Sequence, residues 1–261
     1  MQKFIQTVDT CLMTKVRRLL DDTTLTSDEK RCGKCGICCK TNPELVPQFN
    51  EELAEEAMSH IKNGRKTFAC KREAPINLTF KQPGLSNHLP DELLAEDGLV
   101  LSYWKDVGWG SLVQKGKMQG EFSEELVDAM ADMIKKHLQP STWLEKGWIT
   151  CVPSNNENHG NLVPFFSFRL SKRLKLPFRP IVEKVMKNEP QKERKNNYHR
   201  WQNLDGAFKI KEDAEIFRGP VILVDDVVRS TLTMTVISAL LRKAGSGPVY
   251  PCGLALIGSD D

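Results

Sequence analysis

The stretch Val221-Ile-Leu-Val-Asp-Asp-Val-Val-Arg-Ser-Thr-Leu-Thr233 decides the fold that we predict for this chain. Its first four residues are apolar and follow Gly219-Pro220, which is typical of a buried strand. From 232 to 244 apolar residues recur at helical spacing, and Gly245 follows them, so the strand is predicted to lead directly into a helix. A buried strand followed by a helix is the repeating unit of a parallel α/β sheet.

Strands and helices alternate on both sides of that stretch. The pattern predicts strands at 148–152 and 249–257, a helix at 164–174 and a short extended piece at 180–182. We therefore predict an α/β domain over 146–261, in which helices flank a mainly parallel sheet.

The acidic pair Asp225-Asp226 is predicted to lie at the C-terminal end of the buried strand, where open α/β sheets bind their ligands. Ser230, Thr231 and Thr233 open the helix that follows, and helix-terminal N–H groups favour a phosphate. Neighbouring carboxylates can hold ribose hydroxyls or a Mg²⁺-bound pyrophosphate. The same residues can also simply end a strand and cap a helix, and spacing alone leaves both interpretations open.

Length and composition place the chain among ordinary globular proteins. It has 261 residues, of which 40% are hydrophobic and 27% charged. We find no signal peptide and no apolar run of membrane-spanning length, so we expect a cytoplasmic protein without a membrane partner. No Walker sequence ending in Gly-Lys-Ser/Thr occurs, which argues against an ATP motor within this chain.

The segment before the α/β domain is predicted to hold two further modules, over 1–64 and 65–145. Helices are expected at 1–20, with an inward apolar face that includes Leu19, and at 50–61. Prolines and glycines interrupt 66–120, which we interpret as mostly irregular. Ser123 is predicted to cap a helix that Pro140 ends.

Four cysteines have the spacing of a metal site. Cys32, Cys35 and Cys38 are each three residues apart, and Cys11 on the preceding helix can complete a tetrahedral set for a structural Zn²⁺. A four-iron cluster is the alternative, but Cys39 directly follows Cys38 and cannot easily reach the same ion. A full set of four thiolates leaves no open coordination position, so the predicted role is structural.

The stretch 171–211 is locally basic, with 12 Lys or Arg against 4 Asp or Glu. It is interpreted either as a contact for the phosphates of DNA or RNA or as a solvated loop.

The segment 221–233 resembles the phosphoribosyl diphosphate signature of type I phosphoribosyltransferases, particularly the ComF type, and Trp148-Ile-Thr-Cys-Val-Pro-Ser154 is similar to that family's first strand and pyrophosphate loop. The resemblance implies that the ligand is phosphoribosyl diphosphate, with Mg²⁺, or a nucleotide. The implied contacts are Pro153 and Ser154 near pyrophosphate, Asp225 and Asp226 at the ribose, and Arg229, Ser230, Thr231, Leu232 and Thr233 at the 5′-phosphate. The family usually has glycine where this chain has Thr231, a departure that puts turnover in doubt.

Cys11 followed by Cys32, Cys35 and Cys38 resembles the zinc segment of RecQ-type DNA helicases, some of which carry a ComF-like domain at their C-terminus. The implied protein lacks the motor, contacts nucleic acid or a partner such as a separate motor, polymerase or nuclease subunit, and acts in DNA processing or bacterial anti-phage defence. The alternatives are an active phosphoribosyltransferase or nucleotide-cleaving effector, and a non-catalytic scaffold that binds nucleic acid.

Overall fold

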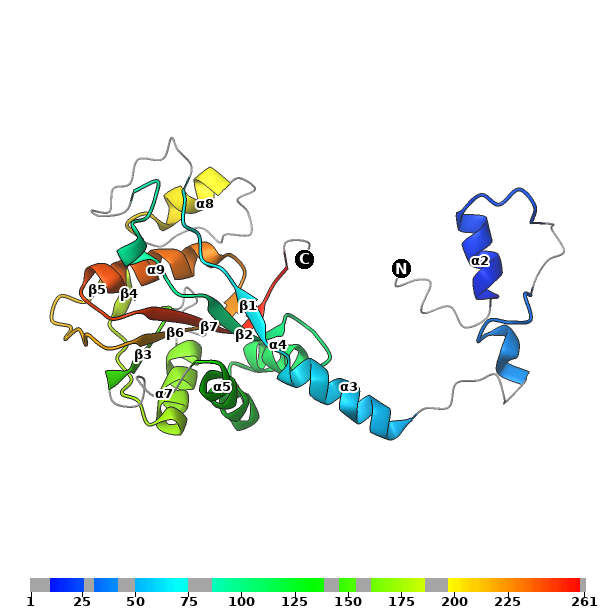
Figure 1. The fold of residues 1–261 in the computed structure, drawn as a ribbon, viewed down its shortest axis with the longest axis horizontal. Coiled ribbons are helices and arrows are strands. Elements are labelled where there is room, and N and C mark those ends of the chain that lie inside the picture. Colours follow the sequence, from blue (N-terminus) through cyan, green and yellow to red (C-terminus); the bar gives the residue numbers. More distant parts are fainter. Residues whose placement is uncertain are drawn as a thin grey trace. The chain divides into compact units, whose positions relative to one another are not determined.

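The computed structural model describes residues 10–25, 31–41, 50–74, 86–138, 146–153, 161–185 and 197–258. The chain divides into two compact units, Met1–Glu56 and Ala57–Asp261 (Figure 1), which we describe separately.

The N-terminal unit contains the helix α2 (Leu12–Leu19), the 3₁₀ turn η1 (Cys38–Thr41) and the start of α3 (Glu51–Asn63), which continues into the larger unit. The predicted inward apolar face of the first helix is wrong at Leu19, which is 71% exposed. Among the described residues of this unit only Cys11, Thr14 and Cys39 are buried. Within 10–25, 31–41 and 50–56, the buried side chains are therefore two cysteines and one threonine and not an apolar stripe.

The larger unit is built on a five-stranded sheet in the order β1-β2-β7-β6-β3. Its strands are β1 (Lys66–Phe68), β2 (Gly98–Tyr103), β7 (Val249–Leu256), β6 (Val221–Val228) and β3 (Trp148–Cys151). β1 runs antiparallel to β2, and the other three pairings are parallel. A mixed α/β fold with a mostly parallel central sheet is thus confirmed.

Helices cover both faces of this sheet (Figure 1). One layer contains α8 (Asn197–Leu204) and α9 (Thr231–Lys243), and the other contains α4 (Gly110–Gln119), α5 (Glu124–His137) and α7 (Leu162–Leu174). Successive residues of β6 point to opposite faces of the sheet. Val221 and Leu223 pack in the core with α9, and Ile222 and Val224 pack in the core with α5 and α7. Burial on both faces explains the uninterrupted apolar run.

Two smaller elements complete the described part of the unit. A separate antiparallel pair joins β4 (Val182–Lys184) to β5 (Phe208–Ile210), and the 3₁₀ turn η3 spans Asp91–Leu93. Among the described residues, no helix has both the length and the apolar character needed to cross a bilayer.

The segment 66–120, interpreted from sequence as mostly irregular, contains β1, β2 and α4. β2 has only six residues, and its central position between β1 and β7 is set by partners far away in the sequence, such as Cys252 opposite Leu99. Its polar Ser102 is fully buried because the hydroxyl donates to the Leu254 carbonyl at 2.7 Å. Ser123 does precede α5, but its side chain makes no capping hydrogen bond.

Candidate functional site

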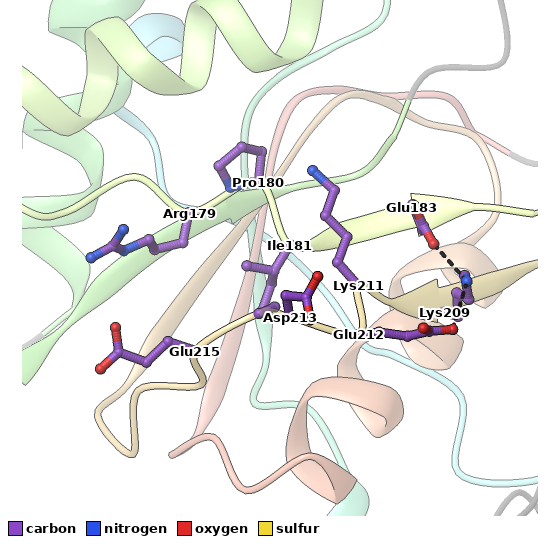
Figure 2. A pocket seen from close by; sticks show the side chains of 10 residues that line it. Arg179, Pro180, Ile181, Glu183, Lys209, Lys211, Glu212, Asp213 and Glu215 are labelled. Atoms are coloured by element: carbon purple, nitrogen blue, oxygen red, sulfur yellow. Dashed lines mark ion pairs between the residues drawn. The ribbon is translucent and has the colours of Figure 1, made fainter.

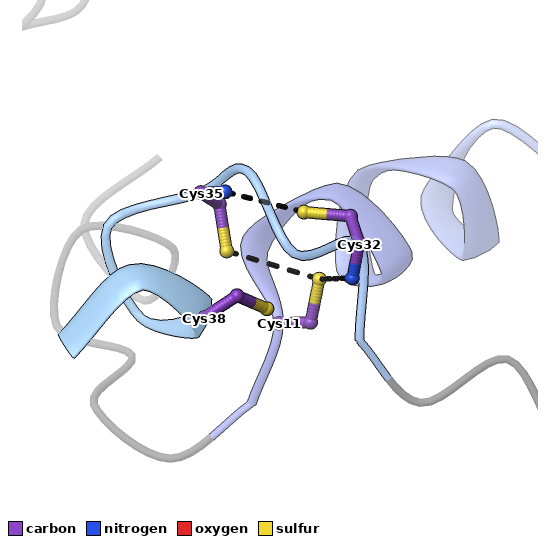
Figure 3. Close-up of side chains that lie close together, drawn as sticks. All are labelled: Cys11, Cys32, Cys35 and Cys38. Carbon is purple, nitrogen blue, oxygen red and sulfur yellow. Dashed lines mark hydrogen bonds between the residues drawn. The ribbon is translucent and has the colours of Figure 1, made fainter. Parts of the chain in front are cut away.

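The four predicted cysteine ligands lie together (Figure 3). The sulfur atoms of Cys11, Cys32, Cys35 and Cys38 all lie within 4.8 Å of one another. Cys11 occupies the N-cap position of α2, and Cys38 begins η1, so one helix start and one turn present their thiols to a common point.

The spacing of the sulfurs fits a metal ion. Cys11 and Cys35 have their sulfur atoms 3.8 Å apart. Tetrahedral coordination with Zn–S bonds of about 2.3 Å places two sulfur ligands about 3.8 Å apart. Backbone N–H groups also point at the sulfurs, from Cys32 to Cys11 at 3.3 Å and from Cys35 to Cys32 at 3.2 Å. The four cysteines can therefore hold a metal ion.

The pKa values of the Cys11 and Cys38 thiols are shifted in opposite directions. Burial raises the pKa of Cys11, but hydrogen bonds from Thr14 and Cys32 outweigh that effect and bring the pKa to about 5. Burial raises the pKa of Cys38 to about 11, and Cys35 and Cys11 beside it add to the rise. A divalent cation removes this conflict because it stabilises every thiolate at once. Cys39 is not part of the cluster, since its thiol donates to the Gly33 carbonyl at 3.3 Å.

The acidic pair lies in the C-terminal half of β6, an interior strand between β7 and β3, and two further strand residues, Val227 and Val228, follow it. Asp225 is opposite Gly253 of β7, and its Oδ1 accepts from the Asp226 N–H at 2.9 Å. Asp226 Oδ1 accepts from the Val227 N–H at 2.6 Å, and its Oδ2 lies 2.6 Å from the ammonium of Lys117. Three of the four carboxylate oxygens thus accept from groups of the chain itself.

The two carboxylates have unequal surroundings. Burial raises the pKa of Asp225 to about 8, and the negative charge of Asp226 adds to the rise, while Lys117 opposes it. Asp226 is ion-paired instead, with a side chain only 12% exposed. The pair therefore combines a carboxyl group whose pKa is raised with one that is ion-paired, and the oxygens of both can accept hydrogen bonds from hydroxyl groups.

Lys117 was not identified from the sequence. It comes from α4, 109 residues before Asp226, and no local motif marks it. In the sequence Lys117 is a lysine in a partly apolar helix, and such lysines are common on protein surfaces, so nothing distinguished it from a solvent-exposed residue.

The predicted phosphate loop becomes the start of α9. Ser230 is the N-cap, and its hydroxyl accepts from the Leu232 N–H at 3.3 Å. Thr231 is the first residue of the helix, and among the described non-glycine residues only Asp21, Lys105 and Lys175 have positive φ. Thr231 consequently needs no conformation that only glycine tolerates.

The other predicted contacts of this loop differ in their exposure. Arg229 is exposed, Thr233 is half-buried, and the side chain of Leu232 packs in the core beneath α9. Pro153 lies two residues after the end of β3, and the Val152 N–H between them donates to the Val224 carbonyl at 2.9 Å. Pro153 thus leaves the sheet beside the strand that carries Asp225. Ser154 lies outside the described residues.

A hollow of about 690 Å³ lies beside β4 and β5 (Figure 2). Its charged lining consists of Arg179, Lys209, Lys211, Glu183, Glu212, Asp213 and Glu215. Glu183 of β4 and Lys209 of β5, which lie opposite each other in the strand pair, form an ion pair at 3.0 Å. The basic stretch 171–211 contributes Arg179, Lys209 and Lys211 to this hollow, whereas Asp225, Asp226 and the predicted phosphate loop do not line it. Three cations against four carboxylates give the hollow no strong preference for an anion.

Comparison with known proteins finds no matching family model and no matching curated protein. The resemblance to ComF-type and RecQ-type proteins thus stays a prediction.

Several solved structures are similar to this chain. A purine phosphoribosyltransferase from Pyrococcus horikoshii shares 18% identity over 52% of this chain and 77% of its own, with a TM-score of 0.34. An adenine phosphoribosyltransferase from Thermoanaerobacter pseudethanolicus shares 14% identity over 56% and 84%, with a TM-score of 0.35. The enzyme of that name from Trypanosoma brucei shares 11% over 80% and 82%, with a TM-score of 0.33. At this identity and overlap, the likeness adds no argument about what this chain does.

Proposed function

We propose that the larger unit binds a phosphoribosyl ligand, either phosphoribosyl diphosphate or a nucleotide, at the C-terminal end of β6. The observation that carries this proposal is the position of Asp225 and Asp226 on a central parallel strand, a few residues before the N-terminus of α9. Ligands of open α/β sheets bind at this end of the strands. The carboxyl groups would accept the ribose hydroxyls, and the N-terminus of α9 would face the 5′-phosphate.

In this proposal Arg229 adds a positive charge at the phosphate, and Pro153 and Ser154 approach the pyrophosphate. Ser230, Thr231 and Thr233 supply hydroxyl donors at the helix start, with Leu232 contributing only its backbone. Binding is the proposed function, and catalysis of phosphoribosyl transfer would in addition require stabilisation of the departing pyrophosphate.

The test is calorimetric titration of phosphoribosyl diphosphate with Mg²⁺, and of nucleoside monophosphates, into the full chain and into Asp225→Asn, Asp226→Asn. For the nucleoside monophosphates we expect micromolar binding that the double variant loses, because a neutral amide neither pairs with Lys117 nor accepts ribose hydroxyls as strongly as a carboxylate does. The matched control is Asp213→Asn, an exposed carboxylate in the wall of the hollow beside β5. Binding lost in the control and kept in the double variant would instead place the ligand in that hollow.

The N-terminal unit, in the same proposal, binds a structural Zn²⁺ and contacts nucleic acid. Four thiolates are the usual donor set of structural zinc and leave no position open for water. The described residues 10–25 and 31–41 carry six Lys or Arg and two Asp, and Arg18, Arg31 and Lys34 are exposed. Fluorescence anisotropy with labelled single-stranded DNA and RNA tests this contact, and we expect binding that weakens steeply with salt. Binding without salt dependence would contradict it.

A further inference from the structure

The ammonium of Lys117 lies directly beside the acidic pair. Its nitrogen lies 2.6 Å from Asp226 Oδ2, and the lysine side chain is 38% exposed against 12% for the aspartate. The contact is thus a partly sheltered, charge-assisted hydrogen bond, which is stronger than an exposed surface ion pair.

The helix that carries Lys117 is held firmly. Gly116 packs so closely that an added Cβ would lie 2.6 Å from the Phe122 ring and 2.8 Å from the Glu121 carbonyl oxygen. Gly120 ends α4 in the left-handed conformation, with φ of 76°. Phe122 is fully buried and packs edge-on against Phe166 of α7. The position of Lys117 is consequently set by the core and not by a mobile loop.

Little coordination capacity remains for Mg²⁺. The ion prefers near-octahedral oxygen ligands and is usually held by one or two carboxylates. Here Asp226 uses one oxygen for Lys117 and the other for the Val227 N–H, and Asp225 uses one for the Asp226 N–H. A hydroxyl donor can still share these oxygens, since each has a second lone pair, and it adds no charge that competes with the lysine.

Resting on the proposed function, we infer that Lys117 replaces a divalent cation at this site, so that the site binds the ribose 5-phosphate group of a monophosphate ligand without Mg²⁺. The chemical class is a nucleoside monophosphate or ribose 5-phosphate itself, and not a Mg²⁺-diphosphate complex. Lys117 acts as a positioning residue: through the ion pair it holds the Asp226 carboxylate in place for the ribose hydroxyls.

The experiment titrates ribose 5-phosphate into the full chain, in buffer stripped of divalent cations on a chelating resin and again with Mg²⁺ added. A resin is used so that no dissolved chelator competes for the cysteine-bound metal. We expect equal affinity in the two buffers. Lys117→Gln should weaken binding about tenfold without Mg²⁺, the loss typical of a charge-assisted contact. Lys117→Arg should keep most of the wild-type affinity. Added Mg²⁺ should partly restore the affinity of Lys117→Gln and should not change that of the other proteins.

Lys115→Gln is the matched control, since it removes an exposed lysine from the same helix. Thermal melting of all variants shows that they are folded. Wild-type binding that requires Mg²⁺, or an affinity that Lys117→Gln leaves unchanged, would overturn the inference while keeping the proposed function. No binding of ribose 5-phosphate, nucleoside monophosphates or phosphoribosyl diphosphate in either buffer would defeat the proposed function itself.

Discussion

The sulfur atoms of Cys11 and Cys35 lie 3.8 Å apart, although 24 residues separate them in the chain. Cys11, Thr14 and Cys39 are the only buried residues among those described in the N-terminal unit. With so few buried residues in the part of the unit that the structure describes, we expect this unit to depend on a bound metal ion for folding.

Cys35→Ser is therefore expected to unfold the N-terminal unit while leaving the larger unit intact. Loss of one thiolate should reduce bound zinc well below one ion per chain, as measured by atomic emission after dialysis. All five tryptophans lie after residue 100, so their fluorescence reports only the larger unit, and its unfolding midpoint should not move.

Cys39→Ser is the control for that variant. Its hydroxyl can keep the hydrogen bond to the Gly33 carbonyl, and Cys39 lies outside the cluster. Zinc content should equal that of the wild type. Equal loss of zinc in both variants would contradict the assignment of the four ligands.

Asp225 should make the larger unit less stable as pH rises from about 4 to about 8. Its pKa is raised to about 8 in the folded chain, chiefly by burial, whereas an unfolded aspartate titrates near 3.9. Between these values the unfolded chain ionises and the folded chain does not, so this group lowers the free energy of unfolding by at most about 1.4 kcal/mol per pH unit. Below both values, and above both, its contribution no longer changes.

Asp225→Asn removes this titration. Urea unfolding followed by tryptophan fluorescence at several pH values measures the effect. The free energy of unfolding of the variant, relative to that of the wild type, should increase as pH rises from about 4 to about 8. The exposed Asp213→Asn should differ from the wild type by a constant amount. A constant difference for Asp225→Asn as well would mean that Asp225 is ionised in the folded chain.

Local patterns predicted the elements whose formation depends on neighbouring residues. The run at 221–228 and the following helix were predicted because strand burial, a capping serine and helical spacing are all contiguous, and the cysteine set was predicted from spacing alone. β2 and Lys117 were missed because each gains its role from a partner more than 100 residues away. Leu19 was misjudged because periodicity indicates a face but not whether anything covers it.

Gly116→Ala is expected to destabilise the larger unit, although alanine normally favours a helix. The methyl group would lie 2.6 Å from Phe122 and 2.8 Å from a carbonyl oxygen, and overpacking of this kind costs about 1–3 kcal/mol. It should also weaken ribose 5-phosphate binding, because α4 must shift and carries Lys117 with it. Urea unfolding and calorimetry measure the two effects. Met118→Ala, at an exposed position of the same helix, should change neither, and a more stable Gly116→Ala would mean that the helix end is loosely packed.

Thr231→Gly tests whether the threonine obstructs the phosphate loop. Thr231 begins α9 without a positive φ, so glycine gains no conformational advantage there and should cost up to about 1 kcal/mol of stability through its greater freedom in the unfolded chain. We expect ribose 5-phosphate affinity to fall about two- to tenfold, the loss of one hydroxyl donor, while the helix N–H groups keep their positions. Thr231→Ala keeps the Cβ and removes the hydroxyl, which separates crowding by the side chain from loss of a donor. An affinity that rises about tenfold in the glycine variant and not in the alanine variant would show that the Cβ itself crowds the phosphate, and Thr231 would then be the residue that limits ligand binding.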